Sequence, residues 1–152
     1  MITLQEISAG IIRILRDKLD IEYITQEDMS CTDGQEFIHI QLIPLKSAAA
    51  AAGHFMDRQI FVDIAYMEKL HTSNERIYEV LDMLDQAFKP YFKIKDRAFS
   101  PPAQMDITDD IGHYKMTLEF TDTVPEEEGS LMEHLAVRLE GKETGGKENG
   151  IT

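Results

Sequence analysis

Apolar positions recur with a helical period in two stretches of the chain. In residues 4–19 they repeat at intervals of three and four, and Thr3 and Glu6 have the spacing of a capping box. A second stripe follows the capping residues of Thr72–Glu75 and ends before Pro90. The sequence therefore predicts two amphipathic helices. The stripe of the first consists of Leu4, Ile7, Ile11, Ile14, Leu15 and, at its margin, Leu19; that of the second consists of Ile77, Val80, Leu81, Leu84 and Phe88.

Between the helices, apolar and polar residues alternate with the period of a β-strand. Glu36–Leu45 and Arg58–Met67 both alternate in this way. These strands are most simply paired antiparallel, with Lys46–Asp57 as the connection. Pro44 has no N–H to donate, so we expect pairing to weaken there or the strand to lie at a sheet edge. Ile21–Thr25 is a shorter strand candidate.

Further strands are predicted after the second helix. Tyr91–Phe99 is expected to form a third long strand, ended by Ser100-Pro101-Pro102. Met105–Thr108 and His113–Thr121 then form a hairpin across Asp109–Gly112. The order α-β-ββ-α-βββ indicates an α+β domain, in which a mostly antiparallel sheet carries two helices packed on one face.

The composition changes after Pro125. Residues 125–152 hold five of the nine glycines and seven glutamates. We therefore divide the chain into a folded domain over 1–124, a C-terminal arm over 125–140 and a tail over 141–152 that we expect to be disordered. In the arm, Leu131, Leu135 and Leu139 fit a helix, whereas Leu135, Val137 and Leu139 fit a strand, and the pattern leaves both open.

The charge of the chain argues against one class of partner. The chain carries 28 acidic and 15 basic side chains, which give a formal net charge of −13. Binding to a phosphate backbone depends on clusters of Lys and Arg, and the sequence contains none. We expect the protein to repel DNA and RNA. An acidic wall is nevertheless a surface along which DNA can pass without being held.

The sequence predicts neither a membrane span nor a secretory signal. No apolar run approaches the ~18 residues that a spanning helix needs. The first residues lack a basic segment and include Glu6. The single cysteine, Cys31, cannot form an internal disulfide, which suits a reducing cytoplasm. It has no neighbouring Lys or Arg, so we do not expect a reactive thiolate.

Sequence motifs that carry chemistry are absent. The patterns of nucleophile elbows, phosphate loops, dinucleotide-binding turns and zinc-binding helices do not occur. His39 and His113 lie in predicted strands and could meet across a sheet, but half-buried strand residues are the simpler interpretation. Asp63, with Arg58 before it, is interpreted as a solvent-face or ion-pairing residue in preference to a catalytic acid. We predict no catalytic, cofactor-binding or metal-binding residues and no enzymatic activity.

Two segments are candidates for contacts between proteins. The first is the predicted connection with its five consecutive alanines, because loops of about a dozen residues are usually functional or disordered and alanine loses no rotamer freedom when it packs. The second is the C-terminal arm. The candidate residues of the connection are Lys46, Ser47, Ala48, Ala49, Ala50, Ala51, Ala52, Gly53, His54, Phe55, Met56, Asp57 and Arg58, and those of the arm are Leu131, Leu135 and Leu139.

Several stretches, taken in order, resemble one known family. They are MITLQEISAGIIRIL, EFIHIQLIP, RQIFVDIAYM, the second predicted helix and GHYKMTLEFTD, and together they cover most of residues 1–121. In the order and spacing of these stretches, the chain resembles the small phage tail terminator proteins of tailed phages and prophages of Gram-positive bacteria. Proteins of this kind are also described as tail completion or head–tail joining proteins.

The resemblance implies a structural protein without catalytic residues or cofactors. It implies a ring, usually of six subunits, that caps the head-proximal end of the tail tube, stops further tube subunits from adding and joins the tail to the head connector protein. DNA would pass through the ring without specific binding, and the net charge of −13 suits such a channel wall. The resemblance also implies assembly in the host cytoplasm and a place in the virion tail, with no membrane partner.

Two other interpretations stay open from the sequence. The acidic surface and the C-terminal arm fit an adaptor that binds a basic protein partner. A small ligand-binding domain or enzyme would need a pocket with perturbed titratable groups. A ring interface would instead bury on the order of 1,000 Å² or more per contact, with aromatic and Met side chains as anchors.

Overall fold

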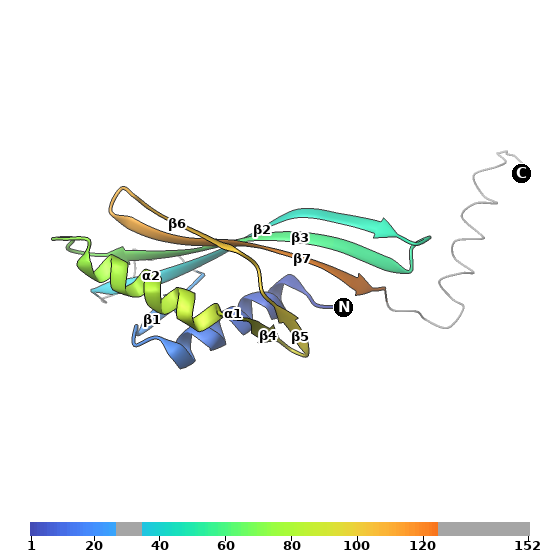
Figure 1. Cartoon of the computed structure of the whole chain (residues 1–152), viewed down its shortest axis with the longest axis horizontal. Helices are drawn as coiled ribbons and strands as arrows, with labels where there is room; N and C mark the ends of the chain where they lie inside the picture. Colours follow the sequence, from blue (N-terminus) through green and yellow to red (C-terminus); the bar gives the residue numbers. More distant parts are fainter. Residues whose placement is uncertain (27–34, 125–152) are drawn as a thin grey trace, which may run out of the picture. The chain divides into compact units, whose positions relative to one another are not determined.

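The computed structural model of the protein describes residues 1–26 and 35–124 (Figure 1). Contacts group Ile2–Asp122 into one compact unit, which holds every element of this part of the chain apart from the last residue of the final strand. The bounds of the elements are α1 Leu4–Lys18, β1 Tyr23–Thr25, β2 Glu36–Ala50, β3 Phe55–Glu68, α2 Glu75–Phe88, β4 Phe92–Ile94, β5 Arg97–Phe99, β6 Ala103–Thr108 and β7 Ile111–Thr123.

Five of the strands form one sheet in the order β1-β2-β3-β7-β6. β1 pairs with β2 in parallel, whereas β2 with β3 and β6 with β7 pair antiparallel. Side-chain hydrogen bonds join Asp57 to Thr121 and Gln59 to Glu119. Residue numbers therefore fall on β7 as they rise on β3, so these two strands are antiparallel as well. The predicted α+β fold with a mostly antiparallel sheet is confirmed.

Both helices lie against the same face of the sheet (Figure 1). α1 begins at the predicted capping box, in which the Glu6 N–H donates to Thr3 Oγ1 and the Thr3 N–H donates to Glu6 Oε1. The apolar stripes of the helices meet alternate residues of the central strands, as their periods require. The centre of this core contains Ile7, Ile11 and Leu15 of α1, Ile77, Val80 and Leu84 of α2, and Ile38, Ile40, Ile60, Val62, Ile64, Tyr66, Tyr114 and Leu118 of the sheet.

The predicted strand over Tyr91–Phe99 is wrong as a single element. The chain turns at Lys95, whose φ of 58° is left-handed, and β4 and β5 pair as a small antiparallel hairpin. The turn places the buried rings of Phe92 and Phe99 in a stacked contact, with 5.6 Å between their centroids. One extended strand would hold these rings about 23 Å apart on opposite faces. Burial of both rings therefore favours the turn.

Pro44 disturbs the sheet as predicted. It pairs with Ile60, and the register then shifts so that Leu45 is an extra residue in β2. β1 ends beside His39, and beyond that residue β2 has a free edge in the part of the chain that the structure describes. Pairing is thus interrupted at the proline, and the proline also lies at an edge.

Some predictions fall on residues 27–34 and 125–152, which lie outside the described residues. They concern Cys31, the C-terminal arm with Leu131, Leu135 and Leu139, and the tail over 141–152. The division of the chain into domain, arm and tail stays a prediction.

Candidate assembly surfaces

β2 and β3 remain paired through the segment that the sequence predicts as a loop. Pairing continues to Ala50 opposite Phe55, so the connection is the four-residue turn Ala51–His54. The predicted loop over Lys46–Asp57 is therefore wrong in its extent. The helix propensity of alanine is weak compared with the pairing offered by a neighbouring strand. We call Lys46–Arg58 the hairpin arm, and Figure 1 shows that its tip extends beyond α1 and α2.

The turn at the tip of the hairpin arm holds alanine in a left-handed conformation. Ala51 and Ala52 have φ angles of 51° and 58°, and Gly53 follows with 88°. The N–H of Gly53 donates to the carbonyl of Ala50, and the N–H of His54 donates to that of Ala51, both at 3.2 Å. A residue with a Cβ adopts this conformation at a cost of roughly 1–2 kcal/mol. Pairing of the strands therefore imposes the shape of the turn.

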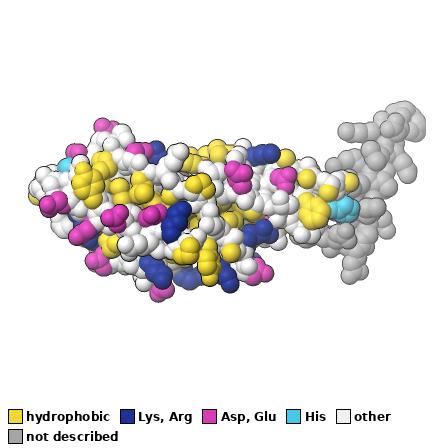
Figure 2. Space-filling view, viewed as in Figure 1, with side chains coloured by type: hydrophobic (Ala, Val, Ile, Leu, Met, Phe, Trp, Pro, Cys, Tyr) yellow, Lys and Arg dark blue, Asp and Glu magenta, His cyan; other side chains and the backbone are white. Residues whose placement is uncertain are grey.

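Three large apolar side chains on this hairpin are exposed to solvent. They are Ile43, Leu45 and Phe55. The space-filling view shows hydrophobic side chains at the surface where the hairpin lies (Figure 2). A single exposed apolar residue is ordinary, but several on one element are typical of a surface that contacts another protein.

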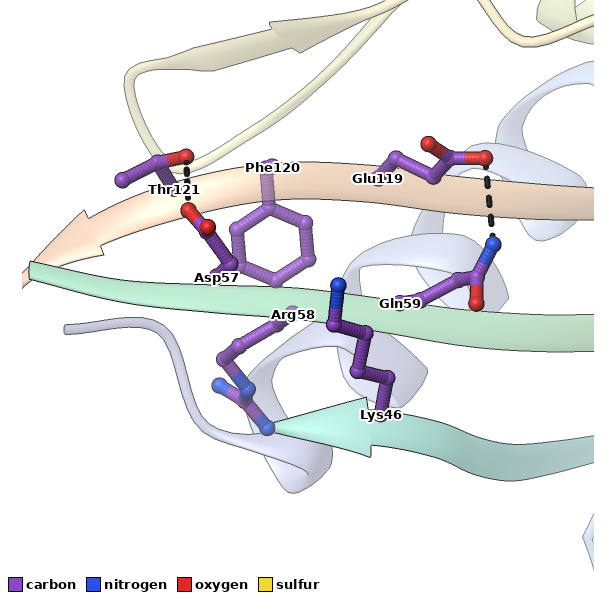
Figure 3. Close-up of a pocket in the computed structure, with 7 residues that line it drawn as sticks. All are labelled: Lys46, Asp57, Arg58, Gln59, Glu119, Phe120 and Thr121. Carbon is purple, nitrogen blue, oxygen red and sulfur yellow. Dashed lines mark hydrogen bonds between the residues drawn. The ribbon is translucent and has the colours of Figure 1, made fainter. Parts of the chain in front are cut away.

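A cavity of 370 Å³ opens at the base of the hairpin arm (Figure 3). Across it, the Gln59 amide donates to Glu119 at 3.1 Å and the Thr121 hydroxyl donates to Asp57 at 2.7 Å, which joins β3 to β7. Small-molecule pockets are lined mostly by apolar side chains, whereas most side chains here are polar. The cavity therefore fits the polar rim of a protein contact better than a ligand site. Its lining residues are Lys46, Asp57, Arg58, Gln59, Glu119, Phe120 and Thr121.

A buried carboxylate joins three segments beside this cavity. Asp122, only 2% exposed, accepts hydrogen bonds from the Ile2 N–H at 3.0 Å and from the Arg97 guanidinium at 2.7 Å. The Arg58 guanidinium donates to the Ile2 carbonyl and lies 4.0 Å from the Asp122 carboxylate. Both guanidinium groups also lie over the Phe120 ring. This group, which we call the Asp122 clasp, fixes the base of the hairpin arm to the start of the chain and to β5.

The clasp was not predicted from the sequence, although the sequence contains a signal for it. Tyr114, Met116 and Leu118 are alternate buried residues of β7, and the same alternation continues to Asp122. An acid at an inward-facing position needs a charged or hydrogen-bonding partner. In β3 the same alternation places Arg58 on the inward face, whereas Asp63 lies on the opposite face of the sheet. Arg58 is therefore the partner that the pattern predicts.

The sheet face away from the helices carries paired polar residues. His113 Nδ1 lies 3.1 Å from Asp63 Oδ1, so Asp63 is a pairing residue. Lys115 forms an ion pair with Asp106, which lowers the pKa of the Asp106 carboxyl and raises the pKa of the Lys115 ammonium. His39 and His113 are not strand neighbours, because β3 lies between β2 and β7. Among the described residues, this face thus carries paired polar groups and no convergent reactive group.

The described residues offer neither a metal-binding cluster nor a membrane-spanning helix. Within residues 1–26 and 35–124, no group of three His, Cys, Asp or Glu side chains is placed to hold a metal ion. In the same residues, no helix has the length and apolar composition required to span a bilayer.

The hairpin arm and the cavity lie within a region that matches a known protein family. A family model described as phage tail terminator protein matches residues 6–130. The chain belongs to this family. No curated protein matches the chain. Tail terminators are structural phage proteins, so the chain has a structural role in completing the phage tail, and the resemblance to phage tail terminators is confirmed. The hairpin arm falls inside the matched region, whereas Leu131, Leu135 and Leu139 lie beyond it.

Proposed function

We propose that the protein caps the tail tube as a ring of identical subunits, stops the addition of tube subunits and joins the tail to the head connector. The observation that carries this proposal is the family match over residues 6–130. A cap must cover every exposed site at the tube end at once. A closed ring does so, because head-to-tail interfaces between identical subunits close on themselves when the rotation permits it. The proposed ring has six subunits, and its partners are the tail tube protein and the head connector protein.

The hairpin arm is the proposed element of contact, either with a neighbouring subunit or with the tube. Three features support this role. The exposed side chains of Phe55 in the arm and of Ile43 and Leu45 just before it can be buried on assembly. The alanines of the arm allow close approach of another backbone, and the Asp122 clasp holds its base in one position. A rigid element loses little conformational freedom when it binds, which favours a tight contact.

The overall charge supports a ring through which DNA moves. A formal net charge of −13 repels a phosphate backbone, so DNA passes without being held. We propose assembly in the host cytoplasm and a final position at the head-proximal end of the virion tail. The proposed role is structural and includes no catalytic step.

Tube growth in solution tests this proposal. Tail tubes from a phage that lacks the gene are mixed with purified tube protein, with and without the purified full chain, and their lengths are measured by electron microscopy. We expect tubes to lengthen in the absence of the chain and to stop when one ring per tube end is supplied. Continued growth with the chain in excess, or the absence of the chain from tube ends, would contradict the proposal.

A further inference from the structure

A second open surface lies between α1 and the edge of β2. It is a groove of 500 Å³, and α1 lines it with Leu4, Ser8 and Ile12 among others, while β2 contributes His39–Leu42. Of the described residues that line it, none is Asp, Glu, Lys or Arg, although the chain as a whole carries an excess of acids. The groove therefore favours an uncharged occupant.

The groove continues the place that β1 occupies in the sheet. β1 pairs with β2 only over Phe37–His39, and its last pair is Thr25 with His39. In the described residues, the following stretch Ile40–Leu42 has a partner strand on the β3 side alone. The backbone groups on the other side form a strand edge, which recruits an extended segment by main-chain hydrogen bonds. The occupant is therefore a strand.

A buried hydroxyl also points to a missing partner. Ser8 is 2% exposed, and its Oγ has no hydrogen-bond partner in the described part of the chain. A buried polar group left unpaired costs about 1–3 kcal/mol. Leu4, Ile12 and Leu42 around it are partly buried and pack against the core. This combination fits a segment that has apolar side chains on one face and a backbone polar group within reach of Ser8.

We propose that His134–Leu139 of a neighbouring copy adds to the free edge of β2 in this groove. In this segment Leu135, Val137 and Leu139 alternate as a strand requires, and no acidic residue interrupts them. The residues between Val124 and Leu135 span about 36 Å when extended, enough to reach a subunit in contact. In this arrangement the segment would be a strand, which is one of the two structures that its pattern allows.

The choice of a neighbouring copy as donor rests on the proposed ring. If each subunit donates one segment and accepts one, every β2 edge is covered and the head-to-tail contact closes. The groove would then be a contact between copies that is separate from the contact made by the hairpin arm.

Cross-linking of the full chain tests the proposal. In a Cys31→Ser background, a Gln41→Cys variant is mixed with an Arg138→Cys variant and treated with a short bismaleimide. Residue 41 is exposed on the groove side of β2, and residue 138 would lie on the outer side of the added strand. We expect a covalent dimer in the mixture. The experiment is done on purified protein and on tails assembled from the two variants.

Two control variants sharpen the result. Tyr78→Cys, on the exposed surface of α2, replaces Gln41→Cys and should give at least tenfold less dimer. Val137→Asp, added to the Arg138→Cys variant, should lower the yield of dimer at least tenfold and leave the thermal unfolding midpoint unchanged, because an acid would enter an apolar groove of the neighbour.

The outcomes separate this proposal from that of the ring. Absence of the dimer both in solution and in tails overturns the groove proposal, and a ring seen by mass or microscopy in the same samples would leave the ring intact. A link confined to one chain, seen in the double variant Gln41→Cys/Arg138→Cys and not in the mixture, overturns the assignment to a neighbouring copy. The dimer formed without any ring would support the strand contact and contradict the closed assembly.

Discussion

Individual residues contribute differently at the two ends of the hairpin arm. At the base, Asp122 collects hydrogen bonds from Ile2 and Arg97, so the arm starts from a fixed position. At the tip, Ala51 and Ala52 take a backbone conformation that favours glycine. Side-chain hydrogen bonds therefore stabilise the base. At the tip, the alanine side chains disfavour the left-handed backbone, and strand pairing maintains it.

Replacing Ala52 by glycine should stabilise the protein. The change removes a left-handed alanine, a gain of roughly 1–2 kcal/mol, and adds the backbone entropy of glycine to the unfolded chain. We expect a net increase of about 0.5–1 kcal/mol in the free energy of unfolding, measured by urea denaturation. Ala48→Gly is the matched control, since Ala48 lies in paired strand opposite Asp57, and it should destabilise. Equal losses in both variants would contradict the account of the turn.

Glu6 should make stability depend on pH in the acid range. A hydrogen bond from Lys95, with further donors at the N-cap, lowers the pKa of Glu6 to about 2. A carboxyl whose pKa is lowered by folding stabilises the protein above its ordinary value near 4.5, and this contribution is lost as the pH falls toward 2. Glu6→Gln keeps an acceptor for the capping box and removes the charge.

Comparing the natural chain with Glu6→Gln tests the predicted direction of this pH dependence. The melting temperature of the natural chain should exceed that of Glu6→Gln at pH 6, and the gap should narrow steadily between pH 5 and pH 2. A gap of constant size over this range would show that the ion pair with Lys95 does not contribute through its charge.

Elements whose signals are local could be predicted from the sequence. α1 combines a capping box with one apolar stripe, and α2 ends before Pro90, so both were expected close to their observed bounds. The interruption of pairing at Pro44 was also predicted from a single residue, since proline has no N–H to donate to the strand ladder. These features depend on residues that are near one another in the chain.

Elements that depend on distant partners were missed. Ala48–Ala50 form a strand only because β3 lies beside them, and the break at Lys95 follows from the stacking of Phe92 on Phe99. The end of β1 at Thr25 agrees with the predicted strand, but its parallel pairing with β2, which leaves the groove beside α1, has no local signal in the sequence. The run of alanines in the sequence thus indicated a candidate site. Its structure, a paired ribbon, depends on β3 and could not be predicted from the alanines alone.

Shortening the hairpin arm should separate folding from assembly. Deleting Ala49–Ala50 together with Phe55–Met56 removes two pairs, keeps the turn Ala51–His54 and leaves Ala48 opposite Asp57. The period of two is preserved, so no remaining side chain changes face. We expect a melting temperature within a few degrees of the natural chain and loss of binding to neighbour or tube, measured by sedimentation and by pull-down with tubes. Normal assembly of this variant would remove the arm from the interface.

The whole molecule combines an ordinary core with an unusual exterior. Helices and sheet bury one apolar cluster, and function is left to the surface. The surface of the described residues has a paired ribbon with exposed apolar side chains and, beyond His39, an unpaired edge of β2, and the full chain has a large negative charge. Within the phage tail terminator family, this combination fits the proposed subunit, which contacts other tail proteins and lets DNA pass.

The most direct measurement is the distribution of tail lengths in a phage with this gene deleted, by electron microscopy. Loss of a cap that stops tube growth predicts overlong tails of irregular length beside filled heads without tails. Normal lengths should return when the full chain is supplied from a plasmid. Virions of normal length and normal number in the deletion would contradict the proposal that this protein ends the tail tube.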